Sequence, residues 1–228
     1  MLFNFEEGEI ILVNKPYRWT SFDVVNFVRS YVKNLPGLKK IKIGHAGTLD
    51  PLATGLLILC TGRMTKQIEQ FKEFDKEYTG TFTIGATTPS YDLETEISQL
   101  VPFDHVTEES ILAAARKLTG TYEQLPPAFS AVKIKGVRAY EYARKDQEVK
   151  IKTKQITIPE FEITGFRLPV ISFRIVCSKG TYIRSVARDL GEKLNCGAYL
   201  SSLCRTRIGT YHLKNAFDLE DLRNQLQP

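Results

Sequence analysis

The alternation of apolar and polar residues predicts most of the strands in this chain. Two stretches, Glu9–Val13 and Leu56–Cys60, are almost continuously apolar, which is typical of short strands buried in a core. Between Glu77 and Ala86 apolar residues alternate with threonines, and this period of two predicts a strand with one buried face. Shorter alternating segments predict further strands near residues 156–158, 161–163 and 171–175.

Apolar residues three or four positions apart predict the helices. One helix is expected to begin at the capping pair Thr20–Ser21 and to end near Leu35, with valines on its inner face. A second is expected over Thr107–Leu118, and a third begins near Thr181. Because the strands follow one another without regular helix alternation, we predict an α+β fold with a mixed, largely antiparallel sheet flanked by helices.

The chain is expected to form a single domain over residues 1–228. Its 43% of hydrophobic residues are enough for a substantial core, and no repeat or low-complexity linker divides it. An acidic segment flanked by prolines, near residues 90–104, is expected to be an exposed insertion.

Cysteine and histidine usage argues against a disulfide frame or a zinc site. The four cysteines show no close pairing, and the three histidines are scattered. The N-terminus has no basic leader, and no apolar run is long enough to span a bilayer. We therefore expect a cytoplasmic protein with reduced thiols, no metal and no membrane association.

Basic residues are concentrated in the C-terminal third. The net charge is +5, yet Lys133–Arg207 alone contains 16 Lys and Arg against 7 Asp and Glu. Such an excess favours a polyanionic partner such as a nucleic acid, although ordinary solvated side chains produce the same pattern.

The segment Gly44–Gly55 contains one carboxylate, Asp50, in a turn rich in Gly and Pro just before an apolar strand. The chain has no phosphate-binding loop, no dinucleotide-binding glycine motif and no nucleophile elbow, which disfavours NTPases, dehydrogenases and α/β-hydrolases. From the residues alone, Asp50 is either the cap of a tight structural loop or a catalytic group on a rigid mount.

This segment resembles the signature of the TruB family of tRNA pseudouridine synthases. The matching run, Gly44–Leu57, reads GHAGTLDPLATGLL. Four other stretches resemble the family in the same order: NKP with TSFD (residues 14–23), KEY (76–78), PPAFSAVK (126–133) and CSKGTYIR (177–184). The resemblance covers roughly Gly8 to Gly209 and implies the pseudouridine synthase fold.

The resemblance implies a cofactor-free isomerisation of uridine 55 in the T arm of tRNA. The base is detached from the ribose of a flipped-out uridine, turned and rejoined through carbon. Asp50 takes the position of the nucleophile, and a carboxylate suits this step because it either bonds to the sugar or stabilises positive charge at the anomeric carbon, as in glycosidases.

Other family positions map onto five residues of this chain. The resemblance makes Tyr78 the aromatic contact of the flipped base and a candidate for proton transfer, and it makes Arg184 the partner that keeps Asp50 ionised. The remaining three positions are candidate substrate contacts: His45 with the T loop, and the uridine-pocket residues Tyr182 and Leu203. Apart from the resemblance, Lys15 and Arg205 are candidate phosphate contacts among the basic residues, for which a solvated position is equally expected. Taken alone, Tyr78 and Leu203 would equally fit a core.

Three departures from the family and two alternatives remain open. Cys204 and Tyr199 stand where relatives commonly carry a basic residue and a histidine, and a C-terminal RNA-binding PUA module is not expected here. The partner is expected to be tRNA, with no obligate protein partner. The alternatives are a synthase for another RNA, such as ribosomal RNA, and a protein that only binds and refolds tRNA, for which Asp50 would be dispensable.

Overall fold

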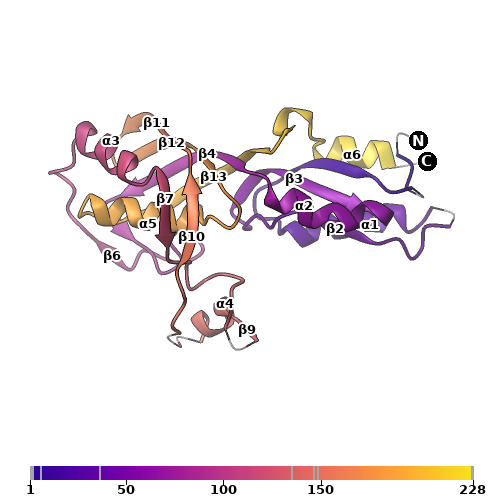
Figure 1. Ribbon diagram of the computed structural model, residues 1–228, viewed down its shortest axis with the longest axis horizontal. Coiled ribbons are helices and arrows are strands. Elements are labelled where there is room, and N and C mark those ends of the chain that lie inside the picture. Colours follow the sequence, from indigo (N-terminus) through magenta and orange to yellow (C-terminus); the bar gives the residue numbers. More distant parts are fainter. Residues whose placement is uncertain are drawn as a thin grey trace. The chain divides into compact units, whose positions relative to one another are not determined.

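The computed structural model describes residues 3–5, 7–35, 37–134, 136–145, 147 and 149–226, which divide into two compact units (Figure 1). The first unit holds the chain up to Tyr78 and from Leu203 onward, and the second holds Thr79–Ser202. Two strands, β4 (Lys76–Ile84) and β13 (Ala198–Ile208), contribute residues to both units. The single domain over residues 1–228 stays a prediction. In the described ranges no helix is long and apolar enough to cross a membrane.

Strand β3 (Ala53–Thr61) lies at the centre of the first unit and contains the predicted core strand. Its side chains alternate between two clusters: Leu57 and Leu59 pack in one, and Leu56 and Ile58 pack in the other. All four side chains are fully buried. A strand with both faces buried must be apolar throughout, which explains the continuous run in the sequence.

Further strands complete the first unit around β3. β1 (Ile10–Lys15) and β2 (Ile43–His45) pair with β3 antiparallel, and β13 pairs with it parallel. β14 (Tyr211–His212) adds to β13 antiparallel, and β4 follows β13 in the strand order. Lys15 of β1 and Arg205 of β13 are both in register with Gly55 of β3, one on each side.

The helices of the first unit cover the two faces of this sheet. They are α1 (Ser21–Val32), η1 (Gly62–Gln67), α2 (Ile68–Glu73), η2 (Leu213–Asn215) and α6 (Leu219–Leu226). α1 begins at the predicted residue, where Thr20 and Asp23 form a capping box, and it ends at Val32, three residues before the predicted end. α1 and α6 pack on the cluster that contains Leu57 and Leu59.

The second unit contains a sheet in the order β13-β4-β12-β11. The hairpin of β11 (Glu160–Arg167) and β12 (Val170–Cys177) is antiparallel, and its strands match the predicted alternating segments. The alternation predicted for β4 is confirmed, because Phe82 and Ile84 are buried while Thr81 and Thr83 are half-buried. Phe82 stacks on Phe173 of β12, with 4.0 Å between ring centroids.

Two helices and a second antiparallel pair complete this unit. The pair is β7 (Gly120–Gln124) with β10 (Lys154–Ile158). The helices α3 (Glu108–Lys117) and α5 (Ile183–Lys193) begin where the sequence predicts, with Thr107 as the N-cap of α3. The described pairs are mostly antiparallel, so the predicted α+β fold with a largely antiparallel sheet flanked by helices is confirmed.

Short elements lie in the two loops of the second unit. They are β5 (Ala86–Thr87) with β6 (Gln99–Leu100), and β8 (Lys133–Ile134) with β9 (Val137–Arg138), followed by α4 (Ala139–Ala143). In the segment between β5 and β6, Ser90 and Asp92 are buried although residues 93–100 are mostly exposed. The first residues of the predicted insertion near residues 90–104 are therefore buried. That this segment is an insertion stays a prediction.

Gly55 is required where the strands β1, β3 and β13 meet. Its φ is +102°, and an added Cβ would lie 2.4 Å from the carbonyl oxygen of Arg205 and 2.7 Å from its amide nitrogen. We expect Gly55→Ala to lower the free energy of unfolding by more than about 2 kcal/mol, because the strained backbone and the clash add together. Urea unfolding measures this loss.

Gly37→Ala is the matched control in the same unit. Gly37 also has a positive φ, +79°, but no atom lies within 4 Å of an added Cβ. Only the backbone strain, roughly 1 kcal/mol, should remain. Equal losses in the two variants would contradict the close packing of β13 against Gly55.

Candidate active site

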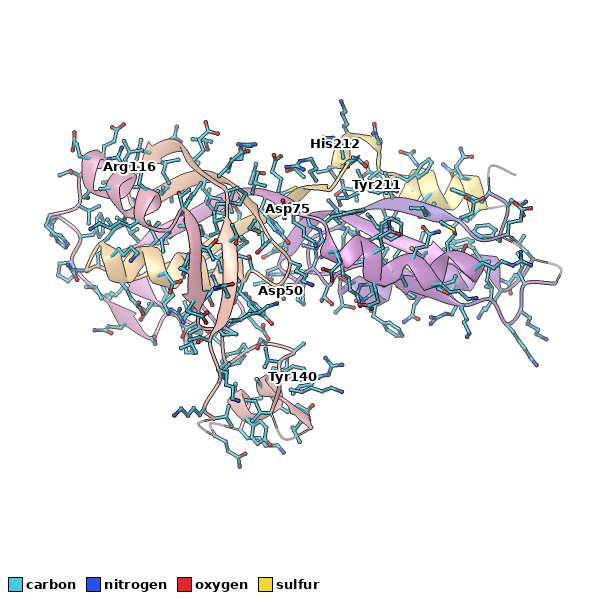
Figure 2. The ribbon with its side chains drawn as sticks, viewed as in Figure 1. Asp50, Asp75, Arg116, Tyr140, Tyr211 and His212 are labelled. Atoms are coloured by element: carbon cyan, nitrogen blue, oxygen red, sulfur yellow. The ribbon has the colours of Figure 1, made fainter. Side chains whose placement is uncertain are left out.

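The loop between β2 and β3 carries Asp50 and is fixed on both sides of it (Figure 2). Ser21, the first residue of α1, accepts a hydrogen bond from the Leu49 amide at 2.8 Å and donates its hydroxyl to the Leu49 carbonyl at 3.2 Å. After Asp50, the Pro51 carbonyl accepts from the Arg18 amide at 2.8 Å. Asp50 itself is half-buried. A carboxylate is thus presented from backbone that neighbouring elements hold in place.

Lys15 lies beside this loop as a fully buried cation. Its ammonium donates to the carbonyls of Trp19 at 2.6 Å, Pro16 at 2.9 Å and Pro51 at 3.4 Å. Burial lowers the pKa of Lys15 to about 8, and the negative charge of Asp50 opposes that shift. These partners differ from the phosphates that the sequence suggested, and the predicted substrate contact of Lys15 stays a prediction.

Arg205 of β13 is the second buried cation beside the loop. It is 1% exposed, and its guanidinium donates to the carbonyls of Gly47, Thr48 and Leu56. The sequence suggested Arg205 only as a phosphate contact, because an arginine in a basic region is ordinarily solvated. No local signal distinguishes it from Arg207, two residues along the same strand, which is half-buried and donates to the Gly209 carbonyl.

His45 lies at the end of β2 against a cavity of about 410 Å³ in the first unit. Burial, followed by the positive charges of Arg205 and Lys72, lowers the pKa of His45. A lowered pKa favours the neutral imidazole. Besides His45, Gly47 and Thr48 of the Asp50 loop, the cavity is lined by Phe22, Val25, Ile43, Gly44, Ile68 and Lys72.

Tyr78 and Leu203 are the other predicted site residues of the first unit. Tyr78 is 9% exposed on β4, on the strand face that also carries the buried Phe82 and Ile84. Leu203 is half-buried on β13, in register with Ala53, which follows Asp50 by three residues. The first unit therefore contains Lys15, His45, Asp50, Tyr78 and Leu203.

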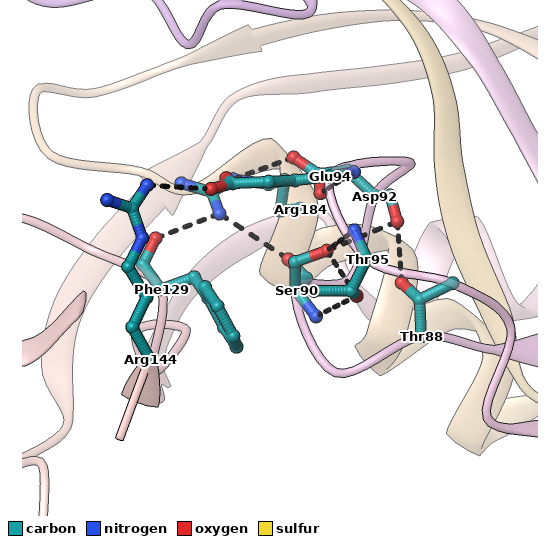
Figure 3. A network of polar contacts seen from close by, with 8 residues as sticks. All are labelled: Thr88, Ser90, Asp92, Glu94, Thr95, Phe129, Arg144 and Arg184. Atoms are coloured by element: carbon teal, nitrogen blue, oxygen red, sulfur yellow. Dashed lines mark hydrogen bonds and ion pairs between the residues drawn. The ribbon is translucent and has the colours of Figure 1, made fainter. Parts of the chain in front are cut away.

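Arg184 lies in the first turn of α5 in the second unit and is 5% exposed (Figure 3). Its guanidinium lies 3.6 Å from the carboxylate of Asp92 and donates to the carbonyls of Phe129 at 2.9 Å and Ser90 at 3.4 Å. A cation near a helix N-terminus opposes the helix dipole, and the Asp92 carboxylate offsets that effect.

Sequence reasoning missed Asp92. It is 4% exposed; its carbonyl accepts from the Thr88 hydroxyl at 2.7 Å, and its carboxylate accepts from the Glu94 amide at 3.0 Å. In the sequence it is one acidic residue of an acidic segment, so nothing marked it as buried.

Tyr182 is the N-cap residue of α5 in the second unit. Its backbone is held by Gln124 of β7, whose side-chain amide accepts from the Tyr182 amide at 2.9 Å and donates to its carbonyl at 3.1 Å. Gln124 is 1% exposed. This two-way bond fixes the start of the helix that carries Arg184. The described residues contain no group of three or more His, Cys, Asp or Glu arranged to hold a metal ion.

Two family models match nearly the whole chain beyond residue 32. The TruB family pseudouridylate synthase (N terminal domain) matches residues 33–183, and the tRNA pseudouridylate synthase B C-terminal domain matches residues 184–227. The resemblance inferred from Gly44–Leu57 is therefore confirmed.

Curated relatives named tRNA pseudouridine synthase B are similar over almost the full length. The relative from Flavobacterium johnsoniae is 54% identical, covering 97% of this chain and 97% of the relative. The one from Phocaeicola vulgatus is 52% identical, covering 95% and 92%. The one from Chlorobium luteolum is 46% identical, covering 97% of this chain but 76% of the relative.

Solved structures support the fold. The chain in a Cbf5-Nop10-Gar1 complex matches with a TM-score of 0.71 and 25% identity, and the archaeal box H/ACA sRNP Nop10-Cbf5 complex matches with 0.70 and 23%. This protein covers 54% of each of those chains, so it spans about half their length. On the two family models and the full-length relatives, the chain belongs to the TruB family of pseudouridylate synthases.

Proposed function

We propose that this protein converts uridine 55 in the T loop of tRNA to pseudouridine, with Asp50 as the nucleophile. The observation that carries the proposal is the way in which Asp50 is held. Its half-buried carboxylate lies on a loop whose backbone is hydrogen-bonded, before and after Asp50, to α1, Lys15 and Arg205. Fixed geometry of this kind favours attack at a single atom of a bound substrate. tRNA as the substrate is supported by the names of the relatives, and position 55 by the bacterial signature around Asp50.

The chemistry needs a single carboxylate. Asp50 either bonds to the anomeric carbon of the ribose or stabilises positive charge there while the bond to the base breaks. The detached uracil stays in the site, turns and bonds to the same carbon through C5, and any bond from Asp50 to that carbon breaks in this step. C5 then loses its proton and N1 gains one, so the reaction is a net isomerisation. No water has to be activated, so the site has to exclude water rather than position it. No cofactor is required.

A uridine in a stacked loop must be extruded to reach Asp50. We assign Tyr78 to the wall against the flipped base, and Tyr182 and Leu203 to the same uridine pocket. His45 is assigned to the T loop, which is consistent with its place on the 410 Å³ cavity next to Gly47 and Thr48. A neutral imidazole contacts RNA through hydrogen bonds and stacking rather than through charge.

Arg184 is assigned to pair with Asp50 and keep it ionised. Its guanidinium is buried and held by Asp92 and two carbonyls, which fixes its direction. Asp92 is thereby assigned to the same group of residues as an orienting carboxylate. We further propose that the protein acts in the cytoplasm on the tRNA T arm without an obligate protein partner.

Asp50→Asn tests the assignment of the nucleophile. Because an amide neither bonds to the sugar nor carries negative charge, we expect the single-turnover rate on a T-arm stem-loop to fall by roughly 10³-fold or more. Binding of the same RNA should change little. Pseudouridine mapping gives the rate, and Asp104→Asn, which alters an exposed carboxylate, is the control.

Two substrates separate this proposal from its alternatives. A stem-loop with cytidine at position 55 should remain unmodified, and a ribosomal RNA fragment should react far more slowly than the T arm. Binding and refolding of tRNA with no pseudouridine from the wild type would instead support a protein that only refolds RNA.

Tyr78 variants test whether the ring alone is used. Tyr78→Phe keeps the aromatic wall and removes the hydroxyl, so a role in proton transfer predicts a loss of about 10²-fold in single-turnover rate with RNA affinity unchanged. Tyr78→Ala should also weaken RNA binding, because the stacking surface is lost. Full activity of Tyr78→Phe would contradict the proton-transfer role. The contact of the ring with the flipped base would then be the only proposed role of Tyr78.

Lys15 gives a prediction on pH. Its pKa in the folded protein is about 8, below the ordinary 10.5, so between these values the unfolded chain binds more protons than the folded one. Stability from this group should therefore rise with pH across that window, by at most about 1.4 kcal/mol per pH unit. In urea unfolding, the free energy of unfolding of the wild type should increase relative to that of Lys15→Met between pH 8 and pH 10. Lys39→Met, at an exposed position, is the control, and a constant difference between wild type and Lys15→Met would refute the prediction.

A further inference from the structure

Arg205 is the largest fully buried side chain in the protein as described, and Lys15 is the next. Burying a guanidinium removes strong hydration, so an arginine is kept in such a place only when its donors are bound. The acceptors of Arg205 therefore indicate what the side chain does.

In the described part of the chain, the side chain of Arg205 donates to backbone carbonyls around Asp50. Its Nε donates to Leu56 O at 2.8 Å, Nη2 donates to Gly47 O at 3.1 Å, and Nη1 reaches Thr48 O at 3.5 Å. Gly47 and Thr48 precede Asp50 in the loop, while Leu56 lies in the strand that follows it. A planar guanidinium binds several acceptors in a fixed geometry, so Arg205 ties the loop to β3.

Lys15 completes the arrangement from the other side of β3. Lys15 and Arg205 are both in register with Gly55, and laterally paired residues in a sheet point to the same face. Lys15 binds the Pro51 carbonyl, directly after Asp50, whereas Arg205 binds carbonyls before it. The loop is therefore held before and after Asp50 by two cations. We call the three residues that lie side by side across the strands the row Lys15–Gly55–Arg205.

The charges of this row also act on each other. The positive charge of Arg205 lowers the pKa of Lys15, and the negative charge of Asp50 raises it. Asp50 therefore stabilises the row electrostatically. In return, the row places positive charge near the carboxylate.

We propose that Arg205 is a positioning residue for Asp50, which sets the place of the carboxylate by binding the backbone carbonyls of Gly47, Thr48 and Leu56. This inference rests on the proposed role of Asp50 as nucleophile. This role differs from that of a phosphate contact, because the guanidinium of Arg205 binds carbonyls inside the protein. A displacement of the nucleophile by about 1 Å is enough to slow a reaction ~100-fold.

Two substitutions of Arg205 test the proposal in the full-length chain. Arg205→Lys keeps a buried cation but loses the planar fork, and Arg205→Ala leaves a hole that guanidinium ion can enter. The single-turnover rate on a T-arm stem-loop is measured with enzyme in excess, beside RNA affinity and melting temperature. Val28→Ala is the stability control, because Val28 is fully buried in the α1 core.

We expect Arg205→Lys to lower the single-turnover rate ~100-fold at a temperature where it is folded, with RNA affinity within about threefold of wild type. Val28→Ala should lose melting temperature and keep its rate. Millimolar guanidinium chloride should raise the rate of Arg205→Ala, whereas ethylammonium chloride at the same concentration should not, because only guanidinium reproduces the fork.

A folded Arg205→Lys protein with a rate within threefold of wild type would overturn the proposal. So would a rate loss that Val28→Ala shares at equal loss of melting temperature, or a folded Arg205→Ala protein that guanidinium does not rescue. If instead the wild type leaves the uridine unmodified, or Asp50→Asn remains active, it is the proposed function that fails, so the two failures are distinguishable.

Discussion

The backbone hydrogen bonds that fix the Asp50 loop depend on the burial of strand β3 on both faces. Leu56 and Ile58 pack into one cluster and Leu57 and Leu59 into the other, so β3 cannot shift without disturbing both. A one-residue slip would exchange the two sets of side chains. The loop that carries Asp50 thus ends at a strand whose register is strongly specified. This strand therefore limits where Asp50 can lie.

Buried cations are an unusual means of fixing a loop, and the geometry here explains why they are tolerated. A buried ammonium or guanidinium is unfavourable when isolated, but Lys15 and Arg205 together bind six carbonyls. Loop carbonyls have no regular secondary-structure partners, so each needs a donor once it is buried. Long side chains that enter from β1 and β13 supply these donors. The absence of a Cβ at Gly55 leaves room between the two strands.

The second unit applies the same principle to a different residue. Arg184 is oriented by the Asp92 carboxylate and by two carbonyls, and the start of its helix is fixed by Gln124. Figure 3 shows that Arg144 and Glu94 extend this network of polar contacts towards α4, through an ion pair of 3.3 Å. That outer pair is exposed and therefore weak, whereas the Arg184–Asp92 pair is shielded from solvent. Rigidity in this network thus decreases from Arg184 outward.

The sequence by itself determined the secondary structure with strong periodicity and the identity of the motif residues. Local preference and burial explain the apolar run of β3, the alternation of β4 and the capped starts of α1 and α3. Both depend on residues that are neighbours in the chain. The motif around Asp50 was recognisable because the continuous run Gly44–Leu57 resembles the family signature. Only the tertiary structure decided that Lys15, Arg205 and Asp92 are buried. As single residues a lysine, an arginine and an aspartate predict solvent exposure. Each of them has at least one acceptor or partner in a segment distant in the chain, and these segments come together only when the sheet and the loops have packed.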